Sequence, residues 1–114
     1  MVADISAFNF THKQCDFTFR LVKLDKTDSF GCDFYNVLAS ANLAGVALLN
    51  DRSVCGEIIQ SPHDPRPLLD NVTDSFRVYG RTNAIDYAVE AAYQLLETRD
   101  APEAVRAFIA FDNE

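Results

Sequence analysis

The sequence lacks the patterns that most often reveal a function. Its four glycines are isolated, so it has no phosphate loop of the GxGxxG or Walker type. Its three cysteines, Cys15, Cys32 and Cys55, form no CxxC pair, and only His12 and His63 could join them at a metal. We therefore expect no nucleotide site, no metal site and no cofactor.

The cysteines and the N-terminus also bear on the compartment. An odd number of widely spaced cysteines does not suit a disulfide framework, so we expect reduced thiols in a cytoplasmic protein. The first residues, MVADISAF, lack the basic start and apolar run of a signal peptide. The longest mostly apolar stretch, residues 37–49, is interrupted by polar residues and is too short to cross a bilayer. We expect no membrane association.

Positive charge is scarce. Ten Lys and Arg stand against seventeen Asp and Glu, which gives a formal charge of −7. Such a chain should repel phosphate backbones, so direct binding to nucleic acid is disfavoured. The same charge attracts basic protein partners and speeds their encounter, although acidity can also serve solubility alone.

The length and composition are those of one domain spanning residues 1–114. A chain of this size buries roughly two-thirds of its unfolded surface without help from disulfides or metal. The hydrophobic content of 48 % is ordinary for a globular protein, and nine phenylalanines predict a core built largely on that residue.

Apolar side chains alternate with polar ones through residues 14–24, which predicts a strand. A shorter strand around Phe8 and Phe10 could pair with it, and the polar residues 25–29 predict a turn. Residues 33–44 fit two structures. We favour a helix capped by Asp33 and ended by Gly45, but the segment could instead continue as a strand in a hairpin with residues 14–24.

Further along, residues 46–49 and 54–59 predict a hairpin around the turn-forming residues 50–53. Three prolines in SPHDPRP, followed by LLDNVTD, predict a loop over residues 61–74. The sequence FRVYG, residues 76–80, alternates like a short strand.

The clearest pattern is a helix over residues 83–98, for which Asn83 is a suitable N-cap. Apolar residues recur at helical spacing and predict a face toward the core. These residues are Ile85, Ala88, Val89, Ala92, Leu95 and Leu96. A second strip, about 60° wide at 100° per residue, is acidic and aromatic. It consists of Asp86, Glu90, Tyr93 and Glu97.

The negative charge continues beyond this helix. Asp100 and Glu103 could cap and begin a further segment, and residues 104–111 fit either a short helix or a closing strand. Taken together, the pattern predicts an α+β fold in which a small antiparallel sheet of about four to five strands is covered on one face by helices. A split βαβ arrangement is one candidate.

Two sites can be weighed for function. His63 and Asp64, with Arg66 in the same proline-rich loop, could form an acid–base pair, but no nucleophile can be identified beside them. The acidic strip is the stronger candidate because like charges at positions 86 and 90 disfavour the helix and no lysine compensates them within it. Tyr93 adds an anchor of the kind enriched at interfaces.

We therefore predict a small, non-catalytic, acidic protein that docks on a basic protein partner and inhibits it. The predicted contact residues are Asp86, Glu90, Tyr93, Glu97, Asp100 and Glu103. An immunity protein against a toxin nuclease, or a phage inhibitor of a nucleic-acid-binding bacterial defence complex, would have these properties, as a monomer or a homodimer. The alternatives are a small enzyme or ligand-binding domain that uses the loop 61–67, and a self-associating structural module.

Overall fold

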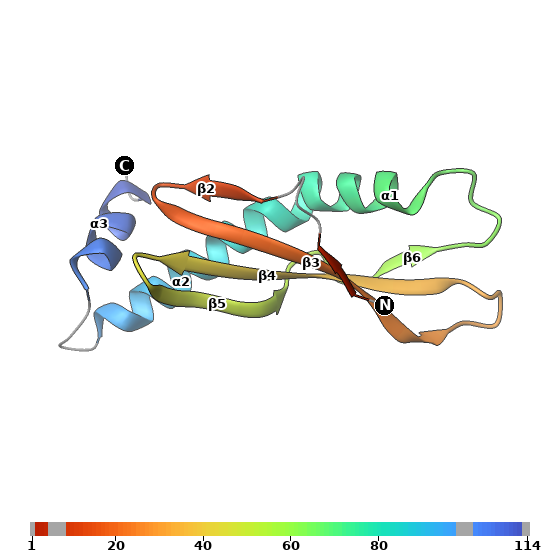
Figure 1. The fold of residues 1–114 in the computed structure, drawn as a ribbon, viewed down its shortest axis with the longest axis horizontal. Coiled ribbons are helices and arrows are strands. Elements are labelled where there is room, and N and C mark those ends of the chain that lie inside the picture. Colours follow the sequence, from red (N-terminus) through yellow and green to blue (C-terminus); the bar gives the residue numbers. More distant parts are fainter. Residues whose placement is uncertain (1, 5–8, 98–101, 113–114) are drawn as a thin grey trace.

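A computed structural model describes residues 2–4, 9–97 and 102–112 and contains one antiparallel sheet with helices against one face (Figure 1). The central strands of the sheet are β3 and β4, which pair with each other. Strands β1 and β2 pair with β3 at one edge, and strands β5 and β6 pair with β4 at the other. The strands are β1 (Val2–Asp4), β2 (Phe10–His12), β3 (Cys15–Thr27), β4 (Asp33–Leu43), β5 (Val46–Ser53) and β6 (Ile58–Gln60). The predicted α+β fold is confirmed. The split βαβ arrangement is not adopted, because no helix lies between the described strands.

The strand predicted over residues 14–24 is confirmed as β3, which extends to Thr27. Its period of two buries Cys15, Phe17 and Phe19 on one face. The shorter strand β2 precedes it and pairs with it, as expected, with Phe10 opposite Phe17. The predicted turn lies a few residues later than residues 25–29, around Asp28 and Gly31.

The helix favoured for residues 33–44 is wrong, because this segment is strand β4. Every second residue from Val37 to Leu43 is buried, and two of these residues are alanines that face phenylalanines of β3 across the sheet. The pairing therefore overrides the helix propensity of alanine. Gly45 does adopt a left-handed conformation, with φ of +84°, but in the tight turn between β4 and β5 and not at a helix end.

The hairpin predicted between residues 46–49 and 54–59 is also wrong. Strand β5 continues through residues 50–53, where Asp51 takes a φ of +54° and the register with β4 shifts. The Asp51 carboxylate lies 2.8 Å from the Arg20 guanidinium on β3, and this ion pair crosses the sheet over β4. The following strand, β6, pairs with β4 and not with β5.

The loop predicted over residues 68–74 and the strand predicted over residues 76–80 are replaced by helix. Helix α1 (Leu68–Ser75) passes into a π-helical turn, η2 (Phe76–Gly80), and then into α2 (Arg81–Leu96) without a break. The prolines explain the first difference. Pro67 directly precedes the first turn and its carbonyl accepts a hydrogen bond from the Asp70 amide, so the proline-rich loop ends where a helix can begin.

The helix predicted over residues 83–98 is confirmed as α2, but it begins at Arg81, and Thr98 lies outside the described residues. Asn83 is not its N-cap, since the helix arrives from η2. The Asn83 side chain instead donates a hydrogen bond of 2.7 Å to the Val54 carbonyl, which joins α2 to the end of β5. Ala84, which lies outside the predicted apolar face, is fully buried with Ala88 and Ala92.

Residues 104–111, for which a helix and a strand were both open, form helix α3 (Glu103–Asp112). Pro102 precedes it, and its buried face consists of Val105, Phe108 and Ile109. Helix α3 covers the end of the sheet at which the β4–β5 turn lies (Figure 1). No helix among the described residues is long and apolar enough to cross a membrane.

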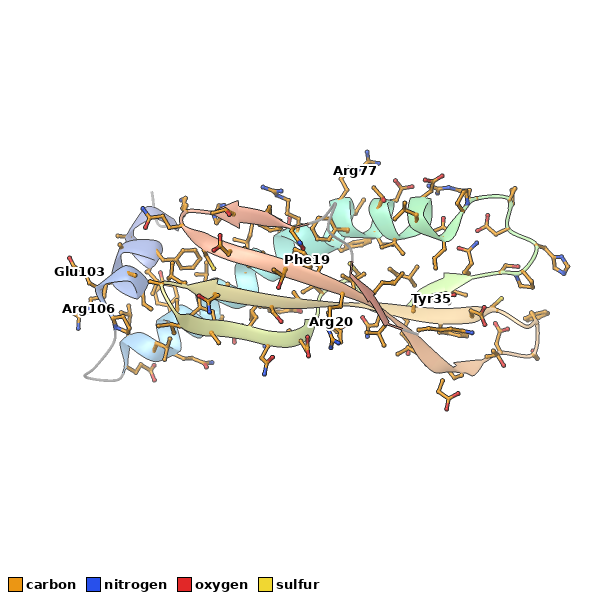
Figure 2. All side chains as sticks on the ribbon, viewed as in Figure 1. Phe19, Arg20, Tyr35, Arg77, Glu103 and Arg106 are labelled. Carbon is orange, nitrogen blue, oxygen red and sulfur yellow. The ribbon has the colours of Figure 1, made fainter. Side chains whose placement is uncertain are left out.

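Phenylalanine rings fill the space between the sheet and the helices. The Phe10 and Phe17 rings stack with centroids 4.8 Å apart, and Phe19 meets Phe76 of η2 edge to face at 4.7 Å. Phe19 lies in the middle of the long axis, where β3 passes the helices (Figure 2). The expected phenylalanine core is therefore confirmed, and the π-helical turn η2 is fixed to the sheet through aromatic contacts.

Gly80 gives a direct test of the packing at the π-helical turn. A Cβ atom at this position would lie 2.6 Å from the Cys55 Sγ atom and 2.9 Å from the Phe76 ring. Gly80→Ala should therefore lower the free energy of unfolding by about 1–3 kcal/mol through overpacking, measured by chemical denaturation. Thr82→Ala, at an exposed position two residues later, is the control and should change it by less than about 0.5 kcal/mol. A Gly80→Ala variant as stable as the parent would contradict this packing.

Candidate functional site

The predicted acidic strip lies on the outer side of α2. Ala84, Ala88 and Ala92 form the buried line that faces the core. At 100° per residue, the predicted contact residues of α2 lie within about 40° of the direction opposite Ala88. All of them are exposed, namely Asp86, Glu90, Tyr93 and Glu97. The strip is thus opposite the buried alanines, whereas the larger residues of the predicted apolar face, such as Val89 and Leu96, are half-buried.

The carboxylates of this strip carry uncompensated charge. The five ion pairs found within the described parts of the chain involve Asp33, Asp51, Glu57 and Asp74, and none includes Asp86, Glu90 or Glu97. Like charges one helical turn apart, as at positions 86 and 90, repel each other by a few tenths of a kcal/mol. The strip is therefore an acidic surface that takes part in no ion pair within the described residues.

Two predicted contact residues, Asp100 and Glu103, lie beyond α2 in the sequence. Glu103 is exposed in the first turn of α3, where a carboxylate favours the helix dipole, and Arg106 follows one turn later (Figure 2). Asp100 lies outside the described residues. The structure therefore places Glu103 on a helix that packs beside α2.

One residue of this surface was missed in the sequence. Tyr79, at the end of η2, is 60 % exposed and precedes Asp86 by seven residues and Tyr93 by fourteen. Multiples of seven residues bring side chains to nearly the same side of a helix, so Tyr79 precedes the acids on this side and Tyr93 lies between Glu90 and Glu97. The spacing was visible, but the predicted strand over residues 76–80 concealed it. We call Tyr79, Asp86, Glu90, Tyr93 and Glu97 the outer strip.

In the loop 61–67, where the sequence offered an acid–base pair of His63 and Asp64, the structure shows a network of hydrogen bonds and an ion pair. The Asp64 carboxylate accepts hydrogen bonds from the Arg66 amide at 2.8 Å and from the Asn71 side chain at 3.3 Å. Arg66 also pairs with Asp74 of α1. His63 is exposed, and no hydrogen bond joins its imidazole to Asp64 in the described part of the chain. These contacts fix the loop to α1.

Cysteine and metal chemistry are not favoured either. Burial raises the pKa of the Cys55 thiol to about 11, so it is protonated at neutral pH and is a weak nucleophile. No group of three His, Cys, Asp or Glu side chains within residues 2–4, 9–97 and 102–112 is arranged to hold a metal.

The helix-free face of the sheet has an open hollow of about 210 Å³, whose lining includes the small polar side chains Thr18, Ser40 and Asn42.

Comparisons of the chain with protein-family models, with curated proteins and with solved structures give no match. The geometry of the outer strip is therefore the basis for a functional proposal.

The Arg66–Asp74 contact predicts how the loop responds to pH. The Arg66 side chain, through its hydrogen bond, holds the pKa of the Asp74 carboxyl below its usual range. The resulting stabilisation is present above the unfolded-state pKa of about 3.9 and is lost as the pH falls through the lower folded-state value. Asp74→Asn should therefore lower the melting temperature at neutral pH but not in strong acid. Asp25→Asn, at an exposed position on β3, is the control, and an equal effect of both variants would contradict the assignment.

Proposed function

We propose that this protein is a non-catalytic binding protein that docks its outer strip on a cationic surface of a protein partner and thereby blocks that surface. The observation that supports this most is the arrangement of three exposed carboxylates that take part in no ion pair within the described residues and share one side of a continuous helix with two exposed tyrosines. A toxin nuclease or a nucleic-acid-binding defence complex would present such a surface, and the carboxylates would occupy the positions of phosphates.

The size of the outer strip suits a protein partner. The nineteen residues from Tyr79 to Glu97 span about 27 Å at a rise of 1.5 Å per residue. A standard interface buries about 800 Å² on each side, which a helix face of this length with its neighbours can supply. Asp86 and Glu90 repel each other in the free protein, and cations of the partner would relieve that repulsion.

The two kinds of side chain have different tasks in this proposal. Exposed acids steer a basic partner toward the strip and accelerate association, in a manner that salt weakens. Tyr79 and Tyr93 bury ring area at low cost in side-chain entropy, which slows dissociation. The acids should therefore govern the association rate and the tyrosines the dissociation rate.

Self-association through a sheet edge has less support. Strand β5 is irregular, since its pairing with β4 shifts register and Asp51 takes a left-handed conformation, and an irregular strand hinders the addition of another strand at its free edge. Two copies meeting through their outer strips would bring like charges together. The loop 61–67, which an enzyme would need, is occupied by its own network of hydrogen bonds.

The acids are tested by charge reversal. A pull-down from the native host at low and at raised salt identifies the basic partner, which is then purified for kinetic measurements. Glu90→Lys with Glu97→Lys should weaken binding at least tenfold, mainly through a slower association rate. Asp70→Lys, an exposed acid on α1, is the matched control and should change binding less than threefold. Binding insensitive to salt and to charge reversal at Glu90 and Glu97 would refute the proposal.

The tyrosines are tested separately with the same purified partner. Tyr79→Ala and Tyr93→Ala should each raise the dissociation constant about fivefold to thirtyfold through faster dissociation, because truncated anchors at an interface cost about 1–2 kcal/mol. Both positions are well exposed, so the melting temperature should change little. Val78→Ala, at the exposed position next to Tyr79 in η2, controls for the loss of exposed apolar area. If Tyr79→Ala behaves like Val78→Ala, Tyr79 does not belong to the contact.

A further inference from the structure

Phe30 stands apart from the other phenylalanines of the chain. Its side chain is 80 % exposed, whereas the others with described side chains are buried or half-buried. Those are Phe10, Phe17, Phe19, Phe34, Phe76 and Phe108. An exposed phenylalanine forgoes about 1.5–3 kcal/mol of burial, so its position outside the core is a feature to be explained.

The turn that carries Phe30 is firmly built. The Asp28 carboxylate accepts hydrogen bonds from the Phe30 amide at 2.9 Å and from the Cys32 amide at 3.0 Å, and the Asp28 carbonyl accepts one from the Gly31 amide at 3.1 Å. The bond from Cys32 is the main reason why the pKa of the Asp28 carboxyl lies below its usual range. Phe30 is thus held in place by its own backbone and does not depend on contacts of its ring.

Neighbouring segments brace this turn. A Cβ atom on Gly31 would lie 3.9 Å from Pro62, so the β3–β4 turn touches the loop 61–67. The Cys32 side chain is buried directly after the exposed ring. The β3–β4 hairpin extends to one end of the 52 Å long axis, and α3 lies at the other end (Figure 1). Because the backbone of the turn is already held by hydrogen bonds, little backbone entropy is lost when the apolar side chain at its tip enters a pocket.

The charges around Phe30 are mainly negative. Residues 23–33 carry two lysines and the acids Asp25, Asp28 and Asp33, and a fourth acid, Glu57, contacts this segment through Lys26. Both lysines are engaged, since Lys23 pairs with Asp33 and Lys26 pairs with Glu57. Asp25 and Asp28 have no ion pair within the described residues. A ring surrounded by excess acid suits a pocket with a cationic rim and is repelled by an anionic membrane.

We propose that Phe30 is a docking residue that inserts into an apolar pocket with a cationic rim on a protein partner. The contact is separate from the outer strip, because the tip lies at the end of the molecule away from the C-terminal end of α2 (Figure 1). Phe30 supplies the buried ring area, and Asp25 and Asp28 supply the charge that meets the rim.

A photo-crosslinker at position 30 tests the proposal. Benzoylphenylalanine replaces Phe30 in the native host, mass spectrometry identifies the protein that crosslinks, and that protein is purified and titrated with variants of the full chain. Phe30→Ala should weaken binding about thirtyfold or more, as expected for a central anchor. Leu69→Ala, which removes a similarly exposed apolar side chain on α1, should change binding less than twofold. Because Phe30 is exposed, the melting temperature of Phe30→Ala should match that of the parent.

Phe30→Trp gives a second measurement, since the chain has no tryptophan and the variant carries a single reporter at the tip. Its emission should shift to shorter wavelength on addition of the purified partner and stay unchanged with phosphatidylglycerol or phosphatidylcholine vesicles. A shift with vesicles alone, the absence of any crosslink at position 30, or unchanged binding by Phe30→Ala would overturn the proposal. If Phe30→Ala binds normally while Glu90→Lys with Glu97→Lys does not, only the tip proposal fails. The reverse result removes the outer strip and leaves Phe30.

Discussion

The structure depends on how large and small side chains are divided between the layers of its core. Phe17 and Phe19 of β3 lie opposite Ala41 and Ala39 of β4, and α2 contributes another line of alanines from its own side. The rings therefore occupy space that the alanines leave open, as close packing requires. The fully buried alanines Ala84, Ala88 and Ala92 define which side of α2 faces this core. Its acidic side has only solvent to face.

The parts of the fold with the strongest periodicity could be predicted from the sequence. The alternation in residues 14–24 and the helical pattern in residues 83–98 each agree with burial in the structure. Residues 33–44 were misassigned because alanine is a good helix former, although Val37, Ala39, Ala41 and Leu43 alternate as clearly as β3 does. The long-range pairing with β3 decides between the two structures, and a local pattern does not contain it.

The residues of the candidate sites could also be predicted from the sequence only in part. The exposure of Asp86, Glu90 and Glu97 followed from helical spacing alone. Tyr79 was missed because FRVYG alternates like a strand, and only the continuous helix brings it beside Asp86. Phe30 could not be recognised, because Phe30 and Phe34 share one alternating pattern and yet differ in burial. That difference arises from the turn held by Asp28.

The π-helical turn also has a consequence for tolerance to insertions and deletions. A turn of this kind accommodates one residue more than an α-helical turn, so it sets the rotational phase between α1 and α2. The five π-helical residues turn the chain through about the same angle as four α-helical residues. Deleting one residue between Phe76 and Gly80 would therefore allow an ordinary α-helix and leave the alanine line of α2 facing the core. The same deletion within the first turn of α2 would instead rotate the rest of that helix by about 100° and carry its alanine line away from the core. The π-helical turn is thus the place in the long helix where a change of length disturbs the packing least.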